Sequence, residues 1–327
     1  MIVMQPLYLA VAPLYRPQDA AHMPSPTSSW HRPVFRPTPD TALYFAAASH
    51  EVALATLRRG FTTGSGLMLL DGAAGVGKTL IGLKHLESLP EPTHRIMLQA
   101  SPDMTPVELL QAMLFDLGLP YQGCTEHELR LAVHGDVLRA LAEGQPVAVL
   151  VDEAHHLSAE ALEELRRICN LESKHTDGVS VVLLALPPLR EALHLPRLRS
   201  VQHRLAIRST LEPLTTEESV SYLRHHLREA GSRAGLAITE EAMQLLADAC
   251  GGVPRLLNRT ALLAFHMADA ASVDEVDAEV VLEALNQLEL SVPVPIEGDP
   301  ALLPLVRPSG KPVPKRASAK KSKRTSA

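Results

Sequence analysis

Short apolar runs alternate with longer segments of helical periodicity through the middle of the chain. The apolar runs lie at 67–71 (LMLLD), 95–99 (RIMLQ), 147–151 (VAVLV), 179–186 (VSVVLLAL) and 205–210 (LAIRST). Between them, apolar residues recur with the period of an α-helix near 77–89, 105–117, 126–143 and 158–172. Near-continuous apolar strands separated by helices are typical of a parallel sheet covered on both faces. The pattern predicts an α/β domain with a doubly wound parallel sheet.

Helices are predicted on both sides of this alternating region. Before it, the spacing of Leu43, Val52, Leu54 and Leu57 predicts a helix that ends at Gly60. Beyond Glu212 the strand pattern stops. A capping-box pattern of Thr215 and Glu218 begins one helix there, Thr239 precedes another, and further helices are predicted at 254–270 and 274–290. The C-terminal part of the fold is therefore expected to be a small all-helical subdomain.

The two ends of the chain lack this periodicity. Residues 1–39 contain eight scattered prolines and are expected to form a flexible or loosely docked arm. From Val292 onward, seven prolines and then the segment KPVPKRASAKKSKRTSA predict a disordered basic tail. The expected organisation is an arm at 1–39, an α/β core at 40–212, a helical subdomain at 213–290 and a tail at 291–327.

Composition narrows the class of protein. With 327 residues and 46% hydrophobic content, the chain can form a sizeable core. Its three cysteines are far apart without zinc-ligand spacing, which favours a reducing, intracellular setting. No run of 18 apolar residues occurs, and the apolar stretch at 7–15 is short, contains Pro13 and follows no basic segment. We expect a cytoplasmic protein without a membrane span.

The charge is distributed unevenly. From Arg307 to the end there are eight Lys and Arg residues and no acids, so removing these from the net charge of −6 leaves residues 1–306 at −14. A basic tail can attract nucleic acid of any sequence through counterion release, or it can serve only to keep the protein soluble. The tail lacks aromatic residues for base stacking, so sequence-specific reading is not expected.

The segment GAAGVGKT at 72–79 matches the phosphate-binding P-loop pattern G-x-x-x-x-G-K-[ST]. It lies between a predicted strand and a predicted helix, as the mechanism requires. Glycines let the backbone N–H groups and the helix N-terminus face phosphate oxygens. The lysine then neutralises the β- and γ-phosphates, and the threonine hydroxyl is offered to Mg²⁺. The expected ATP-binding residues are Gly72, Ala73, Ala74, Gly75, Val76, Gly77, Lys78 and Thr79.

Two carboxylates follow the buried strand at 147–151. In a parallel sheet, ligand chemistry takes place at the carboxyl ends of the strands. Asp152 is suited to hold Mg²⁺, directly or through water. Glu153 is suited to polarise the water that attacks the γ-phosphate. The letters DEAH at 152–155 also occur in a helicase motif, but helicases of that type need two motor domains and this chain supplies one. His155 and His156 are expected to be solvated or loop-packing residues rather than metal ligands.

Several arginines are candidates for contact with the γ-phosphate. In GGVPR at 251–255, Pro254 fits the first position of a helix and Arg255 follows it, so its guanidinium could couple the helical subdomain to the nucleotide. Around the fifth strand, one or two of four arginines could act in trans on a neighbouring subunit, and the others are surface charges. These four are Arg197, Arg199, Arg204 and Arg208.

With these motifs in this order, residues 34–290 resemble the AAA+ ATPases of the ExeA/GspA-like (AAA_22) type, which are related to the TniB and TnsC ATPases of DNA transposition. The resemblance is carried by FRPTPDTALYF, SHEVALATLRRG, GAAGVGKT, VAVLVDEAHHLSAEALEELRRICNLE, LPPLREALHLPRLRSVQHRL and GGVPRLLNRTALLA. It implies an AAA+ core with a helical lid, ATP and Mg²⁺ between them, and a homo-oligomeric ring or filament. By position it implies Arg204 as the arginine that acts in trans and Arg255 as the lid sensor.

One departure from these relatives concerns hydrolysis. They tend to carry a polar residue after the fourth strand, where this chain has Ala185, Leu186 and Pro187. Slow hydrolysis is therefore expected. Secretion-type relatives also continue into a membrane helix and a cell-wall-binding part that this sequence does not show. The preference for ATP over GTP is likewise implied by the resemblance, since no NKxD-type guanine motif follows the P-loop.

Three functional hypotheses follow. The first is an oligomeric ATPase that regulates a DNA transaction such as transposition or integration, with double-stranded DNA and a transposase- or integrase-like client as partners. The second is a nucleotide-gated assembly scaffold of a secretion or envelope complex with little turnover. The third is a structural protein that keeps a nucleotide for stability. DNA-dependent stimulation of hydrolysis is expected for the first alone.

Overall fold

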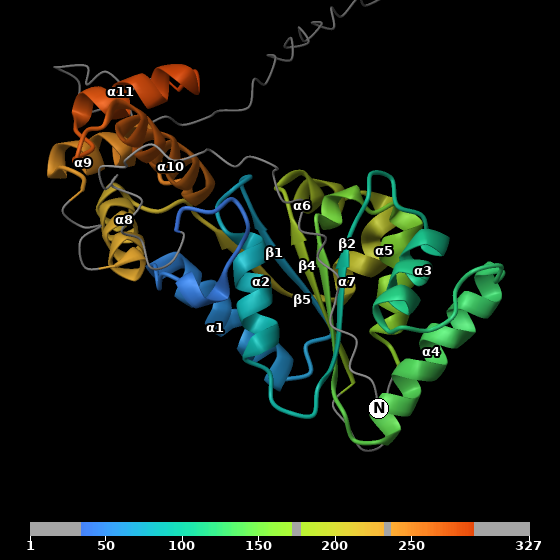
Figure 1. Ribbon diagram of the computed structural model, residues 1–327. Coiled ribbons are helices and arrows are strands. Elements are labelled where there is room, and N and C mark those ends of the chain that lie inside the picture. The colour runs from blue at the N-terminus through green and yellow to red at the C-terminus, as the bar shows by residue number, and fades with distance from the viewer. Residues whose placement is uncertain (1–33, 172–177, 232–236, 291–327) are drawn as a thin grey trace, which may run out of the picture. The chain divides into compact units, whose positions relative to one another are not determined.

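Five parallel strands form one sheet in the computed structural model, which describes residues 34–171, 178–231 and 237–290 (Figure 1). The strand order is β2-β3-β4-β1-β5, and each neighbouring pair is parallel. Each strand matches a predicted apolar run to within one residue at either end. The strands are β1 (Leu67–Gly72), β2 (His94–Gln99), β3 (Val147–Asp152), β4 (Val179–Ala185) and β5 (Leu205–Leu211). The predicted doubly wound α/β sheet is confirmed.

Helices cover both faces of the sheet because successive strand residues point to opposite sides. Leu67 and Leu69 of β1 belong to one core cluster, together with residues of α3 (Pro106–Asp116), α4 (Glu126–Ala142), α5 (Ala159–Ile168) and α7 (Arg199–Arg204). Met68 and Leu70 belong to another, together with α1 (Ala48–Thr62) and α2 (Lys78–Glu87). A short helix, α6 (Pro188–Ala192), follows β4. Continuous apolar strands thus supply two cores at once.

Capping side chains define where several core helices begin. Thr105 and Thr125 each form a complete capping box, with Glu108 and Glu128 respectively, at the starts of α3 and α4. Ser158 accepts a hydrogen bond from Ala161 N at the start of α5. Each of these bonds satisfies a backbone N–H that has no partner inside its own helix.

The predicted helix before the P-loop is displaced in the structure. A short 3₁₀ turn occupies Thr41–Leu43, α1 begins at Ala48, and the helix continues through Gly60 to Thr62. The prediction that the helix ends at Gly60 is therefore wrong. A Cβ placed there would lie 2.3 Å from Met68 Sδ and 2.5 Å from Ile207 Cδ1. The glycine is required because α1 packs closely against the sheet.

Within residues 212–231 and 237–290, four helices follow the sheet and form a core of their own. They are α8 (Thr216–Ala230), α9 (Glu240–Ala249), α10 (Pro254–Ala271) and α11 (Ala278–Gln287). The predicted capping box of Thr215 and Glu218, the cap at Thr239 and the position of Pro254 at the start of a helix are all confirmed. The last helix starts later than the predicted residue 274, because Asp277 caps it through Val280 N.

Part of the predicted N-terminal arm is packed into this helical core. Val34 and Phe35 are each 1% exposed, and the Phe35 ring stacks on Phe265 and His226. The expectation of a flexible or loosely docked arm is wrong for these two residues, because they bury apolar surface that helical neighbours would otherwise leave exposed. Residues 1–33 and the basic tail lie outside the described residues. Among the described helices, none is long and apolar enough to cross a membrane.

Candidate functional site

The P-loop turns from β1 into α2 at the carboxyl edge of the sheet. Gly75 and Gly77 adopt positive φ values of 81° and 105°, and Gly77 is the N-cap of α2. Side chains rarely tolerate this backbone conformation. Neighbouring elements also crowd both positions, since a Cβ on Gly75 would lie 2.9 Å from Arg255 Cβ, and one on Gly77 would lie 3.1 Å from His50 Nε2. Both positions therefore require glycine, because of the backbone conformation and because of the crowding.

Lys78 begins α2 and is held over the loop. Its Nζ donates hydrogen bonds to the carbonyl oxygens of Gly72, at 3.0 Å, and Ala73, at 2.8 Å. Burial lowers the pKa of the ammonium group, and the nearby carboxylates of Glu153 and Asp152 oppose that shift. A cation at the N-terminus of a helix, next to a glycine-rich loop, provides the electrostatic setting for a polyphosphate.

Thr79 and Asp152 meet across the sheet edge. Thr79 Oγ1 donates to Asp152 Oδ2 at 2.7 Å, and Asp152 Oδ1 accepts from Glu153 N at 2.8 Å. Asp152 is the last residue of β3 and only 7% exposed. A hydroxyl beside a carboxylate is the oxygen-only donor set that Mg²⁺ prefers when phosphates supply further ligands. These two residues fit the predicted metal role.

Glu153 follows directly and lies at the mouth of the site. Its backbone has a positive φ of 53°, which turns the chain sharply out of β3 into the 3₁₀ turn Ala154–His156. Its side chain is 37% exposed and lines the same cleft as Lys78 and Thr79. A partly exposed carboxylate facing the phosphate loop has the access to water that a general base requires.

The helical subdomain closes the cleft from the other side. Arg255 N donates to Gly75 O at 3.2 Å, so the first turn of α10 touches the P-loop backbone directly. The exposed Arg255 side chain lines the cleft together with Glu153 and Lys78. The structure thus brings the predicted lid arginine to the loop that contacts phosphate.

Three further parts of the cleft were missed by the sequence reasoning. Residues 36–39 line it, and so do Tyr222 of α8 and Asn258 of α10. Tyr222 Oη donates to Asn258 Oδ1 at 2.9 Å, and Asn258 Nδ2 donates to Arg36 O at 3.3 Å. Residues 36–39 and Asn258 lie in two of the segments that carry the family resemblance, but nothing in the sequence shows that these segments and Tyr222 meet at one cleft.

His50 supports the P-loop from behind. Its Nε2 lies 2.9 Å from Val76 O and its Nδ1 lies 3.2 Å from Ser49 Oγ, while the residue is only 4% exposed. Burial lowers the pKa of His50, and the hydrogen bond to the carbonyl oxygen of Val76 and the charges of Glu218 and Glu51 oppose that shift. The same helix is tied to α8, because Ala48 N donates to Glu218 Oε1 at 2.9 Å.

The residues at the position where relatives carry a polar sensor, after β4, are apolar, and one of them lines the cleft. Ala185 is buried, and the Leu186 side chain lines the cleft. A leucine cannot orient a water molecule through a hydrogen bond, so the residue after β4 contributes shape alone to this wall of the cleft.

The arginines around β5 differ in where they point. Arg204 turns inward, where its Nη2 donates to the carbonyl oxygen of Cys169 at 3.0 Å and its buried Nε has no acceptor among the described residues. Arg197, Arg199 and Arg208 are exposed. None of these four arginines is among the described residues that line the cleft.

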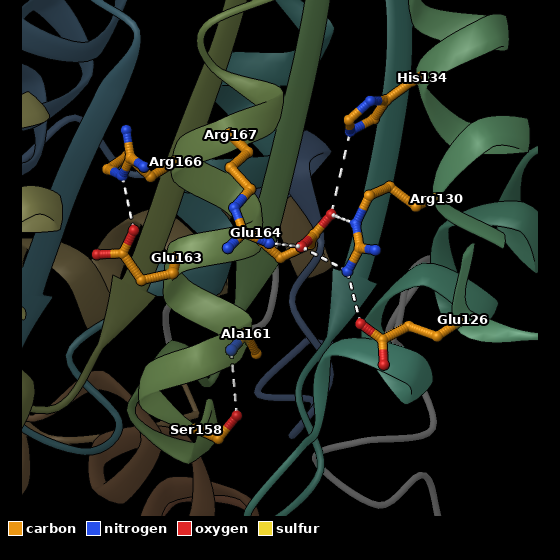
Figure 2. A network of polar contacts seen from close by, with 9 residues as sticks. All are labelled: Glu126, Arg130, His134, Ser158, Ala161, Glu163, Glu164, Arg166 and Arg167. Carbon is orange, nitrogen blue, oxygen red and sulfur yellow. Dashed lines mark hydrogen bonds and ion pairs between the residues drawn. The ribbon is translucent and has the colours of Figure 1, made fainter. Parts of the chain in front are cut away.

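Helix α5, which follows Glu153, is anchored by an ion network around one buried glutamate, Glu164 (Figure 2). Glu164 of α5 is fully buried and accepts from Arg130 Nε at 2.7 Å and from Arg167 Nη1 at 2.8 Å. Arg130, on α4, also binds Glu126 at 2.6 Å. Burial disfavours ionisation of Glu164, but the two arginines outweigh it, so its pKa lies below the usual value. The network fixes α5 against α4.

His155 and His156 lie beside Glu153 rather than in solvent. Their rings are 4.2 Å apart between centroids, and His155 Nδ1 lies 3.4 Å from Glu153 Oε2. Burial and the neighbouring His156 lower the pKa of His155, and the charges of Glu153 and Asp152 oppose that shift. Both histidines are half-buried, so the expectation of loop-packing residues agrees with their exposure.

Comparison with known sequences places this site within a recognised domain type. A family model described as an AAA domain (AAA_22) matches residues 61–193. General secretion pathway protein A of Aeromonas hydrophila is 36% identical over 227 residues, which cover 69% of this chain and 41% of that protein. The chain therefore spans less than half the length of this relative.

Solved structures share the fold at low sequence identity. Cdc6p from Pyrobaculum aerophilum has a TM-score of 0.64 at 15% identity and covers 78% of this chain and 70% of its own. The ORC1 protein of Aeropyrum pernix in complex with DNA has a TM-score of 0.60 at 21% identity, with coverages of 77% and 68%. At these identities the likeness concerns the fold, which is a parallel five-stranded core followed by helices.

Proposed function

We propose that the chain binds Mg²⁺ and ATP between core and lid and works as a nucleotide-controlled regulator of a DNA transaction. The proposal starts from the AAA+ P-loop ATPase domain and the helical region that follows it. The observation that carries the nucleotide-controlled part is the hydrogen bond from Arg255 N to Gly75 O. Through this contact, occupancy of the loop shifts the lid to the extent that ATP binds more tightly in one lid position than in another.

In this proposal the chain's own residues divide the work of binding. Lys78 exchanges its bonds to Gly72 O and Ala73 O for phosphate oxygens, and the N–H groups of the loop face the same anion. Thr79 and Asp152 hold the metal, which neutralises developing charge on the phosphates when bound. Asn258, Tyr222 and the segment 36–39 line the same cleft, and we assign them to the nucleoside part of ATP.

For hydrolysis we assign Glu153 as the base that orients and polarises the attacking water. General bases of this kind contribute about 10²–10⁴-fold to rate. Leu186 offers no polar group to help position that water, which supports slow turnover and a role for nucleotide as a switch. Completion of the site by an arginine of a neighbouring subunit in a homo-oligomer would raise the rate.

Among the candidate arginines, exposure favours Arg197, Arg199 and Arg208 over Arg204 for this trans role. Each of the three is exposed and has no partner among the described residues, so each is free to reach a second chain, and Arg199 is the one chosen for substitution. Arg204 would first have to break its bond to Cys169 O. The family resemblance implies Arg204. The two assignments predict different effects when each arginine is substituted.

The DNA part of the proposal is supported by charge and by the resemblance to the TniB and TnsC ATPases. Eight Lys and Arg residues after Val306 provide a sequence-independent attraction for double-stranded DNA. The client proposed from that resemblance is a transposase- or integrase-like protein. Cytoplasmic location is part of the same proposal.

The test is Mg²⁺-dependent ATP turnover of the purified chain with and without double-stranded DNA at low salt. Glu153→Gln should lower turnover by about 10²–10⁴-fold and keep ATP binding, while Glu160→Gln, an exposed glutamate on α5, serves as the matched control. A full-length variant with the eight tail charges changed to glutamine should lose DNA stimulation, and raised salt should weaken it in the parent.

Unchanged turnover in Glu153→Gln would contradict its catalytic assignment. ATP binding and turnover that ignore DNA in every variant would contradict the DNA role. That second result would favour the other candidate, a nucleotide-gated scaffold of a secretion or envelope complex, which the 36% identity to a general secretion pathway protein supports.

A further inference from the structure

Three possible metal ligands gather beside the cleft. One ligand atom from each of Glu153, His155 and His156 lies within 4.8 Å of the other two. Glu153 is the first residue after β3, and both histidines belong to the 3₁₀ turn that follows it. The turn is closed by a hydrogen bond from His156 N to Glu153 O at 2.9 Å. The backbone itself therefore keeps the three side chains together.

The protonation of His155 makes this arrangement electron-rich. Leu186 N donates to His155 Nδ1 at 3.5 Å, so that ring nitrogen carries a lone pair and no proton. The same Nδ1 lies 3.4 Å from Glu153 Oε2, which is also an acceptor. Two acceptors that face each other repel. A cation that bound both would displace Leu186 N from the single lone pair of Nδ1 and would remove the repulsion.

The distances are close to those of a bound metal. Ligand atoms around tetrahedral zinc, at bonds of about 2.0–2.1 Å, lie about 3.4 Å from one another. The present spread of up to 4.8 Å would have to shrink by roughly 1 Å or a little more. The Glu153 side chain is 37% exposed and the His155 side chain 15% exposed, so small side-chain rotations can supply this.

The donor set selects the class of cation. Two imidazole nitrogens and one carboxylate suit zinc and its first-row neighbours, whereas Mg²⁺ and Ca²⁺ prefer oxygen ligands alone. Against the sequence expectation that neither histidine binds metal, we propose that Glu153, His155 and His156 form a binding site for a transition-metal dication such as Zn²⁺, separate from the Thr79 and Asp152 pair. Metal in this site occupies the carboxylate that would otherwise orient water. It therefore inhibits turnover, a consequence that rests on the proposed role of Glu153.

Binding is tested without nucleotide or Mg²⁺, by titrating Co²⁺ into the full-length chain after removal of any histidine tag. The parent should develop the visible absorption of cobalt with nitrogen and oxygen ligands, and Zn²⁺ should displace it. His155→Asn and His156→Asn should each bind at least about 10-fold more weakly, because each removes a ligand. His127→Asn, a histidine on the exposed side of α4, is the matched control and should behave as the parent does.

Inhibition is tested by adding Zn²⁺ to turnover at saturating Mg²⁺ and ATP, with each variant compared with its own zinc-free rate. The half-inhibitory zinc concentration should rise about 10-fold or more in His156→Asn. It should stay unchanged in His127→Asn.

Absent cobalt absorption, or equal affinity in the parent and both histidine variants, would overturn the site. Cobalt binding with no zinc inhibition would overturn the claim that the metal takes Glu153. A chain with no measurable turnover but a cobalt spectrum that depends on His155 and His156 would support the site and would contradict the proposed hydrolysis instead.

Discussion

The hydroxyl of Thr79 donates a hydrogen bond to Asp152 Oδ2 at 2.7 Å and so joins the first turn of α2 to the end of β3. The two residues are 73 positions apart in the chain. Their contact brings a hydroxyl and a carboxylate to one point beside the phosphate loop, where a divalent cation would bridge them to ATP.

Replacing Thr79 tests this relationship. Thr79→Val keeps the shape of the side chain and removes the hydroxyl, so we expect the Mg²⁺ dependence of ATP binding to disappear and turnover to fall about 10-fold or more. Thr79→Ser should retain both properties. Fluorescent ATP binding with Mg²⁺ and with EDTA is the measurement, and a valine variant that still responds to Mg²⁺ would exclude the residue as a ligand.

His50 is predicted to hold the P-loop in its binding shape. His50→Leu removes the contact with Val76 O, which is worth about 0.5–1.5 kcal/mol, so ATP affinity should fall by about 2- to 13-fold. Val52→Ala, at a position 65% exposed on the same helix, is the control. Isothermal titration with ATP checks the prediction, and equal affinities in the two variants would remove His50 from the site.

Substitutions of the inward Arg204 and the exposed Arg199 should have different effects on stability and turnover. Arg204→Ala loses the bond to Cys169 O and should lower the free energy of unfolding by about 1–3 kcal/mol. Arg199→Ala should leave thermal stability unchanged and lower turnover only at protein concentrations where the chain oligomerises. Melting temperature and turnover against protein concentration distinguish them. If Arg204→Ala melts as the parent does yet turns over slowly, the trans role belongs to Arg204.

Glu164 is predicted to make stability depend on acid pH. Its pKa is lower in the folded chain than the usual value of about 4.3, because Arg130 and Arg167 stabilise the charged form despite burial. A lowered carboxyl pKa stabilises the folded state above the unfolded pKa, and this contribution is lost as pH falls through the folded pKa. The melting temperature of the parent should therefore fall as pH drops below about 5.

Glu164→Gln should be less stable at pH 7 by about 1–3 kcal/mol, since it weakens the hydrogen bonds from Arg130 and Arg167, whose own side chains are 24% and 53% exposed. Its melting temperature should also depend less on pH between about 5 and 3 than that of the parent. Glu160→Gln, at an exposed position on the same helix, should match the parent. A Glu164→Gln profile that runs parallel to the parent's would show that other carboxylates cause the acid loss.

By itself, the sequence determined those features that depend on residues close together in the chain. The five strands, most helix starts and the P-loop follow from apolar period, capping residues and glycine placement, which act over a few positions. Gly60 was misassigned because whether a glycine ends a helix or lets it pack closely depends on a neighbour, here Met68, that the local sequence does not name.

Only the tertiary structure decided which distant residues meet. The contact of His50 with Val76, the path of residues 36–39 beside Asn258, and the inward turn of Arg204 onto Cys169 all join segments that carry no shared motif. The gathering of Glu153, His155 and Leu186 likewise needed the adjacency of β3 and β4. Such contacts arise from burial and sheet order, which are properties of the whole chain, and so no short stretch of sequence encodes them.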